Sequence, residues 1–467
     1  MAITHQQELH SPKGETQSEI QMTHGEGHTI YFLGIGGIGM SALARYYQSL
    51  GYTIAGYDRT PSPLTQQLED EGMAIHYEDN PGLLPALIEI VIYTPAVPKE
   101  LTEFEALRKR NIKIMKRSEA LGEVSGHHFT LAIAGTHGKT TTTAMTAHIL
   151  NTCGKDTTAF IGGIANNFES NLLLGKGAES IMVVEADEFD RSFLKLQPNI
   201  SIINSIDADH LDIYGDRKHL VESFNEFAKL TERQVIVKEG LTIEADNIIR
   251  FGFSEGNDYR TEIIHSENGI TDFKIIGEGQ ITEIRLPMAG RHNVLNATAA
   301  FIAARQVGIA PEAIAAALST FKGVKRRFDI RINNAKHCYI DDYAHHPEEI
   351  KACLTAVKEA FKGRKLTVVF QPHLFSRTRD FMDSFAEALA LTDELILLDI
   401  YPARELPIEG ITSEALLNKV QLFDKKLCTK AELIDLINSE KPEILVTMGA
   451  GDIDRFVEPL EKLIKTW

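Results

Sequence analysis

The stretch AIAGTHGKTTTTAM, from Ala132 to Met145, has the residue types of a loop that binds phosphate groups. It follows an apolar run typical of a strand and leads into a run typical of a helix, which is the context that a P-loop requires. In such a loop the backbone N–H groups cradle phosphate oxygens, Lys139 carries charge to the β- and γ-phosphates, and the Thr140 hydroxyl can bind Mg²⁺. Ile133 stands where the consensus has its first glycine, so a chance Gly-Lys-Thr turn is the alternative.

Acidic side chains follow the next two apolar runs, SIMVVEADEFD and IINSIDADHLDIYG, where parallel strands would end. They are Glu185, Asp187 and Glu188 after the first run, and Asp207, Asp209 and Asp212 with His210 after the second. Because the carboxyl ends of parallel strands share one edge of a sheet, we expect these groups beside the P-loop, where carboxylates can hold a hard cation. Any one acid could be a solvated strand end, but His210 among them favours a second metal site.

A second glycine loop lies near the start of the chain, in IYFLGIGGIGMSALARYY from Ile30 to Tyr47. Its G-x-G-x-x-G spacing predicts a pyrophosphate held at a helix N-terminus. Asp58 ends the next apolar run, where a dinucleotide-binding enzyme would hold a ribose, although it could equally be a solvated turn residue. Taken alone, this loop would fit an NAD(P)-dependent oxidoreductase, but that interpretation leaves the P-loop, Glu185 and His210 without a role.

The elements that must position these loops alternate between strand-like and helix-like runs along the chain, which predicts parallel sheets in α/β domains. We expect three domains: residues 29–122, Rossmann-like; residues 123–324, a central domain with a P-loop ATPase-type parallel or mixed sheet; and residues 325–467, again Rossmann-like. The more polar stretch 247–287 is expected to be partly antiparallel. Residues 1–28 are predicted to be a disordered lead-in.

The composition excludes several classes of protein. The chain has 467 residues, of which 43% are hydrophobic, so it is too long for a single core. With 48 Lys and Arg against 65 Asp and Glu, the net charge is −17. The sequence has no stripe of basic residues, which argues against a nucleic-acid partner. No apolar run approaches the roughly 18 residues of a membrane span. The four cysteines lack C-x-x-C spacing. We expect a cytoplasmic protein, a monomer or weak homodimer, without membrane insertion.

Seven stretches, in order along the chain, resemble the signatures of the Mur ligase family. They are GTHGKTTTT, EADEFDRSFL, DADHLDIYG, GRHNVLNATAA, KGVKRRFD, DDYAHHP and FQPHLFSRTRDF. The resemblance runs from about Thr29 to the C-terminus. It implies an ATP-dependent ligase that phosphorylates the carboxylate of a nucleotide-linked muramic acid, after which an amine attacks the acyl phosphate. The P-loop would then hold ATP with two Mg²⁺ ions, and the first glycine loop the diphosphate of a UDP-sugar.

The resemblance also implies roles for individual residues. The catalytic group is Lys139, Glu185, His210 and Arg327, and the metal ligands are Thr140, Glu185 and His210. The ATP contacts are Gly135, Thr136, His137, Gly138, Lys139, Thr140, Thr141, Asn293, Asn296, Arg327 and Asp342. The UDP-sugar contacts are Gly34, Gly36, Gly37, Gly39, Met40 and Asp58. The amino-acid contacts are Tyr343, His345, His346, Arg377 and Arg379. On spacing alone, the two asparagines would fit an N-cap and a polar helix face, and the basic residues of KRRFD a solvated linker.

The chain departs from the family pattern at two positions. In the pattern H-R-[FY]-[ST]-R-T-R, Leu374 replaces the first arginine, which leaves Arg377 as the main candidate for a bidentate contact with the α-carboxylate. Asn225 stands where some members carry a carbamylated lysine that bridges metal ions, so no bridging group of that kind is expected here.

The wording of the motifs favours one activity within the family, the addition of L-alanine to UDP-N-acetylmuramate. The nearest alternative is a sister ligase that joins a murein tripeptide to the same sugar nucleotide. VEADEFDRSFLKLQPNI, DADHLDIYG and FQPHLFSRTR favour the alanine-adding enzyme over that sister. A nucleotide-binding regulator without catalytic activity is an alternative from another class.

Overall fold

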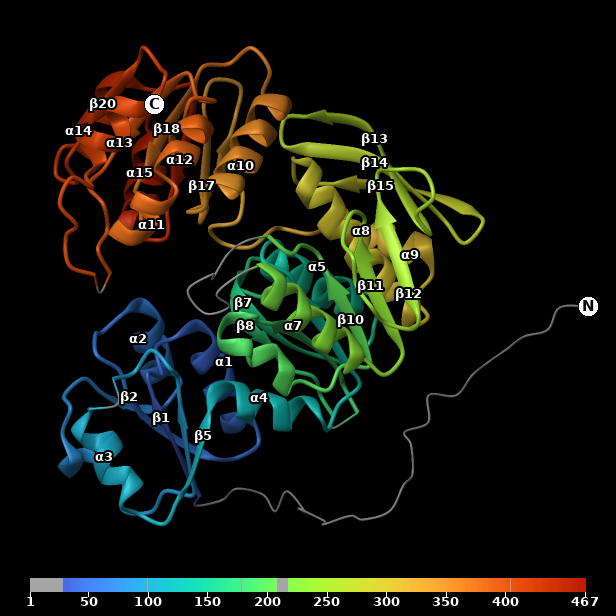
Figure 1. The fold of residues 1–467 in the computed structure, drawn as a ribbon, viewed down its shortest axis with the longest axis vertical. Helices are drawn as coiled ribbons and strands as arrows, with labels where there is room; N and C mark the ends of the chain where they lie inside the picture. The colour runs from blue at the N-terminus through green and yellow to red at the C-terminus, as the bar shows by residue number, and fades with distance from the viewer. Residues whose placement is uncertain (1–27, 99, 178, 208–216, 404) are drawn as a thin grey trace, which may run out of the picture.

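The computed structural model of the chain describes residues 28–98, 100–177, 179–207, 217–403 and 405–467. These residues form three α/β parts, each built on its own sheet (Figure 1). The first part, in blue, and the last, in orange and red, both lie beside the central part, in green and yellow. The predicted lead-in at 1–28 falls outside the described residues, except for His28. Three α/β parts with mainly parallel sheets agree with the fold class that the alternation of strand-like and helix-like runs predicted.

The first sheet has five parallel strands in the order β3-β2-β1-β4-β5. Its elements are β1 (Thr29–Leu33), α1 (Ile38–Ser49), β2 (Thr53–Tyr57), α2 (Pro63–Asp70), β3 (Ala74–His76), η1 (Pro81–Leu83), β4 (Ile90–Tyr93), α3 (Thr102–Arg108), β5 (Lys113–Lys116) and α4 (Arg117–Ser125). Residues 30–33 of β1 are apolar and buried, as a central strand covered on both faces requires. The strand order reverses beside β1, so the first glycine loop lies at a switch point, where open α/β sheets bind ligands.

The central sheet has ten strands in the order β15-β14-β13-β12-β11-β10-β6-β9-β7-β8. Its elements are β6 (Thr130–Ala134), α5 (Lys139–Thr152), β7 (Thr157–Ala165), β8 (Ser170–Leu173), β9 (Ile181–Ala186), η2 (Phe189–Lys195), β10 (Ile200–Ile203), α7 (Arg217–Lys229), β11 (Gln234–Lys238), β12 (Ile248–Gly252), β13 (Tyr259–Glu267), β14 (Ile270–Gly277), β15 (Gln280–Leu286), α8 (Arg291–Gln306) and α9 (Pro311–Leu318). Strands β9 and β10 flank β6 and run parallel to it, so their carboxyl ends lie on either side of the P-loop.

Strands β12 to β15 confirm the partly antiparallel stretch that was predicted at 247–287. Strand β12 runs parallel to β11, whereas β13, β14 and β15 form an antiparallel meander. Buried side chains alternate with partly buried ones along β14 and with exposed ones along β15, because only one face of the meander packs on the core. Phe273 and Ile275 on that face join the same buried cluster as residues of α8.

The third sheet has six strands in the order β16-β17-β21-β18-β19-β20, parallel except for β16. Its elements are β16 (Asp329–Asn333), β17 (Cys338–Asp342), α10 (Pro347–Ala360), β18 (Leu366–Phe370), α11 (Phe375–Asp380), α12 (Met382–Leu389), β19 (Glu394–Leu397), α13 (Ser413–Lys419), β20 (Lys425–Leu427), α14 (Leu433–Glu440), β21 (Ile444–Met448), η3 (Asp452–Phe456) and α15 (Val457–Ile464).

Buried apolar clusters continue from one part into the next. Phe32 of β1 shares a cluster with Val184 of β9, and Leu131 of β6 shares another with Leu354 of α10. The first and third parts are therefore packed against the central part. In the part of the chain that the structure describes, no helix is both long and apolar enough to cross a membrane.

Candidate active site

The P-loop connects β6 to α5 and is held in shape by its two glycines and by Ser205. Gly135 and Gly138 have φ values of +137° and +81°, which L side chains rarely adopt. A Cβ atom at Gly138 would lie 2.5 Å from Oδ1 of Asn296, so the loop leaves a space that only glycine keeps open. The N–H of His137 donates to Oγ of Ser205 over 2.8 Å. This cradle fits a phosphate group at the N-terminus of α5.

Lys139 lies at the start of α5, with its ammonium group folded back over the loop. Its Nζ donates to the carbonyl oxygen of Gly135 over 2.8 Å and contacts both carboxylate oxygens of Glu188, at 2.8 and 3.0 Å. Burial pushes the pKa of Lys139 down, but attraction from Glu188, and then from Asp187 and Glu185, leaves that pKa above its ordinary value. Lys139 is therefore a fixed positive charge at the position where a P-loop lysine meets phosphate.

Glu185 ends β9 beside the P-loop, as the strand order requires. Its Oε1 accepts the N–H of Gly162 over 2.7 Å. Burial raises the pKa of this carboxyl, and Lys139, the Gly162 N–H and a hydrogen bond with Thr140 oppose the rise. The carboxylate and the Thr140 hydroxyl are the hard oxygen donors that Mg²⁺ prefers, so the two residues fit that ion.

The predicted third metal ligand, His210, lies outside the described residues, as do Asp209 and Asp212. Among residues that the structure does describe, no group of three or more His, Cys, Asp and Glu side chains could hold a metal ion. Asn225, at the position of the bridging lysine, accepts the N–H of Glu244 over 3.0 Å. The described part of the site therefore provides two of the three predicted metal ligands.

A cavity of about 380 Å³ lies between the P-loop, α8 and α10. Its lining includes His137, Gly138, Thr141, Asn204, Ser205, Asp207, Phe253, His292, Asn293, Asn296, Arg327, Asp342, Glu349 and Cys353. Asn293 and Asn296 are 2% and 6% exposed, and Nδ2 of Asn293 donates to the carbonyl oxygen of Ala289 over 2.8 Å. The mixture of amide, aromatic and acidic groups suits a nucleoside next to the phosphate cradle.

Arg327 reaches this region from the segment that connects the central part to the third. Its guanidinium lies 4.9 Å from the centre of the Tyr343 ring. The carboxylate of Asp342, at the end of β17, accepts the N–H of Phe328 over 2.6 Å and that of Ala344 over 2.7 Å. Burial raises the pKa of Asp342 to about 6, and Arg327 opposes that rise. Asp342 thus lines this cavity and also fixes the backbone next to Arg327.

A second cavity, of about 360 Å³, is lined by residues of both glycine loops. Gly37, Gly39, Met40 and Arg117 come from the first part, Lys139, Thr140, Gly162, Glu185 and Asp187 from the central part, and Arg327 from the third. The two loops are about a hundred residues apart in sequence. The fold therefore brings the first glycine loop and the P-loop to one cavity.

The first glycine loop depends on Asp58 for its shape. The N–H of Gly36 donates to Oδ2 of Asp58 over 2.8 Å, and Gly34 has a φ of +84°. Among the described residues, Gly37, Gly39 and Met40 line the second cavity whereas Asp58 does not. The structure therefore places Asp58 as a support for the loop.

The five predicted amino-acid contacts do not all come together. Nδ1 of His345 lies 3.0 Å from the carbonyl oxygen of Tyr343, and the His345 ring meets the ring of His373 edge-on with the centres 6.2 Å apart. Nη1 of Arg377 lies 3.5 Å from Nδ1 of His373. Tyr343, His345 and Arg377 thus form one group with His373.

The other two predicted contacts lie apart from that group. His346 is buried and caps α10, where its Nδ1 accepts the N–H of Glu348, and its ring packs against Phe381. Arg379 is half exposed and pairs with its neighbour Asp380 at 2.7 Å. These contacts give His346 a structural role and direct Arg379 toward solvent.

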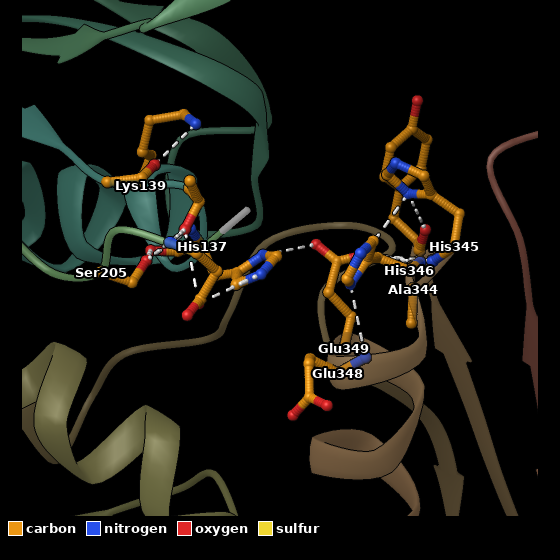
Figure 2. A network of polar contacts seen from close by, with 12 residues as sticks. His137, Lys139, Ser205, Ala344, His345, His346, Glu348 and Glu349 are labelled. Carbon is orange, nitrogen blue, oxygen red and sulfur yellow. Dashed lines mark hydrogen bonds and ion pairs between the residues drawn. The ribbon is translucent and has the colours of Figure 1, made fainter. Parts of the chain in front are cut away.

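The central and third parts also meet through a polar contact. Figure 2 shows the imidazole of His137 on the P-loop pointing at the carboxylate of Glu349 on α10, with Nδ1 and Oε1 3.2 Å apart. Glu349 also accepts the backbone N–H of His345 over 3.1 Å. One carboxylate therefore connects the phosphate loop to the segment of the predicted amino-acid site.

The sequence did not identify Ser205, Glu349 or Arg117 as contributors to the site, whereas Glu188 was expected beside the P-loop as one of the acids that follow β9. Ser205 lies two residues after the buried strand β10, and Arg117 directly follows β5, so both lie at carboxyl ends of strands, a position from which they could have been proposed. Glu349 is 212 residues from His137 in sequence, so only the folded chain shows their contact.

The sequence is similar to those of known proteins along nearly the whole chain. The Mur ligase family, catalytic domain, matches residues 29–129; the Mur ligase middle domain matches 133–304; and the Mur ligase, glutamate ligase domain, matches 326–451. The UDP-N-acetylmuramate--L-alanine ligase of Cytophaga hutchinsonii is 47% identical over 93% of this chain and 97% of its own length. The enzyme of that name from Flavobacterium psychrophilum is 50% identical over 93% and 98%.

Solved structures agree with these sequence matches. The crystal structure of the UDP-N-acetylmuramate-alanine ligase of Thermotoga maritima has a TM-score of 0.81 and 29% identity over 94% of this chain and 99% of that one. A murein peptide ligase from Psychrobacter arcticus has the same fold, with a TM-score of 0.69 and 24% identity over 94% and 99%. With all three family domains matched in order, the chain belongs to the Mur ligase family.

Proposed function

We propose that the protein joins L-alanine to the carboxyl group of UDP-N-acetylmuramate at the expense of ATP, a step in peptidoglycan precursor synthesis. Relatives named for this activity are 40–50% identical over more than nine tenths of the chain. The observation that carries the proposal is the second cavity, because residues of both glycine loops and Arg327 face it together. A sugar acid held by the first loop can there approach a terminal phosphate held by the second.

The chemistry proceeds in two balanced steps. The sugar carboxylate attacks the γ-phosphorus of ATP, forming an acyl phosphate and releasing ADP. The ammonium group of alanine loses a proton to solvent and the resulting amine attacks the acyl carbon. The bond between that carbon and the phosphate oxygen breaks and the nitrogen loses a second proton, which forms the amide and releases inorganic phosphate. Lys139 and Arg327 stabilise negative charge on the transferred phosphoryl group. Mg²⁺, when bound through Thr140, Glu185 and His210, supplies further charge neutralisation, and we propose two such ions.

The nucleotide and sugar sites follow from the two cavities. We propose that Asn293 and Asn296 contact the adenine, that Asp342 contacts the ribose, and that the backbone from Gly135 to Thr141 binds the phosphates. The loop from Gly34 to Met40 would bind the sugar diphosphate, with Asp58 keeping that loop in shape. Arg117 faces the same cavity at the N-terminus of α4, and we add it to the proposed sugar-nucleotide site.

For the amino acid, we propose a site formed by Tyr343, His345 and Arg377, to which His373 contributes. Arg377 would bind the α-carboxylate and hold the amine in line with the acyl carbon. His346 would contribute by capping α10, and Arg379 would reach the site only if its pair with Asp380 opens.

The assay that tests this function measures ADP release with ATP, Mg²⁺ and UDP-N-acetylmuramate across a panel of alanine, serine, glycine and murein tripeptide. We expect release to depend on L-alanine. Release with tripeptide alone would assign the sister activity instead.

We also propose domain boundaries near residues 122 and 324, a cytoplasmic location, and a monomer or weak homodimer.

A further inference from the structure

The P-loop lysine has a partner that the proposed reaction does not use. Lys139 has three N–H donors, and its Nζ contacts the Gly135 carbonyl oxygen and both carboxylate oxygens of Glu188 within 3.0 Å. We propose that Glu188 is a positioning residue that holds Lys139 over the P-loop and shares its charge, thereby weakening the hold of the protein on nucleotide phosphates and favouring the release of ADP. This inference rests on the proposed function in one respect, namely that Lys139 binds a nucleotide phosphate.

Glu188 is buried behind the lysine, away from the substrate cavities. Its side chain is 1% exposed, whereas that of Lys139 is 16% exposed. Among the described residues, Lys139 and Thr140 line the second cavity and the small cavity of about 60 Å³ at the P-loop, and Glu188 lines neither. Glu188 therefore does not occupy the space of the phosphates, and its contact with Lys139 can persist when they are bound.

The backbone around Glu188 is held by hydrogen bonds and aromatic packing. The N–H of Arg191 donates to the Glu188 carbonyl oxygen over 2.9 Å, and that of Phe193 to the Asp187 carbonyl oxygen over 2.9 Å. The Phe193 ring is fully buried and stacks on Phe227, with the ring centres 5.0 Å apart. Because the segment is anchored, the carboxylate is a fixed support for the ammonium group.

The three acids at this edge of the sheet have different partners. Glu185 accepts the Gly162 N–H and faces the second cavity. Asp187 faces the same cavity and lies 3.5 Å from Arg117. Glu188 alone of the three contacts Lys139 directly. This division makes Glu188 a partner of the lysine, whereas Glu185 is placed to bind a metal ion.

A bound phosphate and Glu188 compete for one positive charge. While Glu188 is ionised beside Lys139, the pair has little net charge and attracts phosphate less strongly than a lone ammonium group would. A glutamine at this position keeps a hydrogen-bond acceptor of similar shape but removes the charge. We therefore expect E188Q to bind nucleotide more tightly and to turn over more slowly, because ADP leaves slowly and Lys139 is held less firmly.

The test measures the Kd for ADP by calorimetry in EDTA, together with kcat and KM for ATP in the alanine-dependent assay. We expect the E188Q variant to bind ADP about five- to tenfold more tightly, about the size of one charge interaction that water screens, and its kcat to fall. The control E226Q removes one acid from an exposed pair with Arg191 and should leave both quantities at wild-type values.

Unchanged or weaker ADP binding by folded E188Q would overturn the inference. A loss of Mg²⁺ affinity without a change in metal-free ADP binding would also overturn it, because that result would make Glu188 a metal ligand. If E188Q fails to fold, E188D lengthens the contact and should tighten ADP binding by a smaller factor; wild-type or weaker binding would again contradict the inference. A wild-type protein that binds ADP and consumes alanine while E188Q has no effect leaves the proposed function intact. A wild-type protein that binds no ADP overturns both.

Discussion

The imidazole of His137 and the carboxylate of Glu349 meet across the junction between the P-loop and α10, with Nδ1 3.2 Å from Oε1. Burial lowers the pKa of His137, but the hydrogen bond and charge of Glu349, and then the charge of Asp207, leave it above its ordinary value against the opposing charge of Lys139. Burial raises the pKa of Glu349, yet the charge of His345 and the contact with His137 hold it well below its ordinary value. Both shifts favour the ionised forms of the two groups, and their contact links the P-loop to the third part of the chain.

This link predicts a pH-dependent stability. A raised pKa on His137 stabilises the fold fully below the unfolded pKa of about 6.5, and this contribution is lost as the pH rises through the folded pKa. The lowered pKa of Glu349 contributes above an unfolded pKa of about 4.3 and is lost as the pH falls through its folded pKa. We expect H137Q to lower the Tm more at pH 6 than at pH 8.5. In contrast, H265Q, which breaks an exposed pair with Glu267, should have a small effect at both pH values. An H137Q effect independent of pH would contradict the charged pair.

The two glycine loops predict separate effects on binding and turnover. K139A removes the cation that stabilises the transferred phosphoryl group, so we expect kcat to fall by about a hundredfold or more. The affinity for UDP-N-acetylmuramate should stay close to that of the wild type, because the first loop binds the sugar diphosphate. Calorimetry with the sugar nucleotide and the ADP-release assay measure the two quantities. A variant that lost affinity for the sugar nucleotide would show that the loops do not divide the substrates in this way.

Gly138 predicts a steric effect confined to nucleotide binding. In G138A the new Cβ would meet Oδ1 of Asn296 at 2.5 Å, and the φ of +81° strains any L side chain. We expect the Kd for ATP to rise more than tenfold. Gly308 offers a matched control, since its φ is +80° but a Cβ there meets nothing within 4 Å. G308A should cost about 1 kcal/mol of unfolding free energy and leave the Kd for ATP unchanged. Equal loss of ATP affinity in both variants would assign the effect to general destabilisation.

Substitution of Arg377 is expected to weaken the binding of the amino acid. Because Arg377 would bind the α-carboxylate in both the ground state and the transition state, R377A should chiefly raise the KM for alanine, with a smaller change in kcat. The KM for ATP should change little. An exposed arginine of the same part, Arg455, provides the control variant R455A, whose kinetics should match those of the wild type. A selective loss of ATP affinity in R377A would place this arginine in the nucleotide site.

The sequence predicted the elements whose physical signal is local. Strands such as β1, β6 and β10 are short buried apolar runs next to glycine turns or acids, and all three were expected where they occur. Strands β7 and β8 were not predicted, because their pairing is irregular between Phe160 and Ala165 and includes Gly162 and Gly163. An edge of a sheet with such a sequence has no regular alternation for a pattern to detect.

The site residues that could be predicted are those in loops with recognisable sequence motifs. Lys139, Thr140 and Glu185 come together as the parallel strand order requires, and Asn293 and Asn296 line the cavity between the P-loop, α8 and α10. The supporting contacts themselves were not predicted, although Glu188 was expected beside the P-loop, because each contact joins segments that are far apart along the chain. Asp58 holds the first glycine loop, Ser205 holds the second, and Glu188 holds Lys139. None of these pairings follows from spacing along the chain.

The central claim is that one cavity brings the sugar acid and the terminal phosphate together. A structure with UDP-N-acetylmuramate, Mg²⁺ and a non-hydrolysable ATP analogue measures this directly. We expect a sugar carboxylate oxygen to lie about 3–3.5 Å from the γ-phosphorus, the separation of a reactive pair, with Lys139 and Arg327 on the phosphate. A carboxylate that stays far from the γ-phosphate with both ligands bound and the three parts closed would contradict the claim.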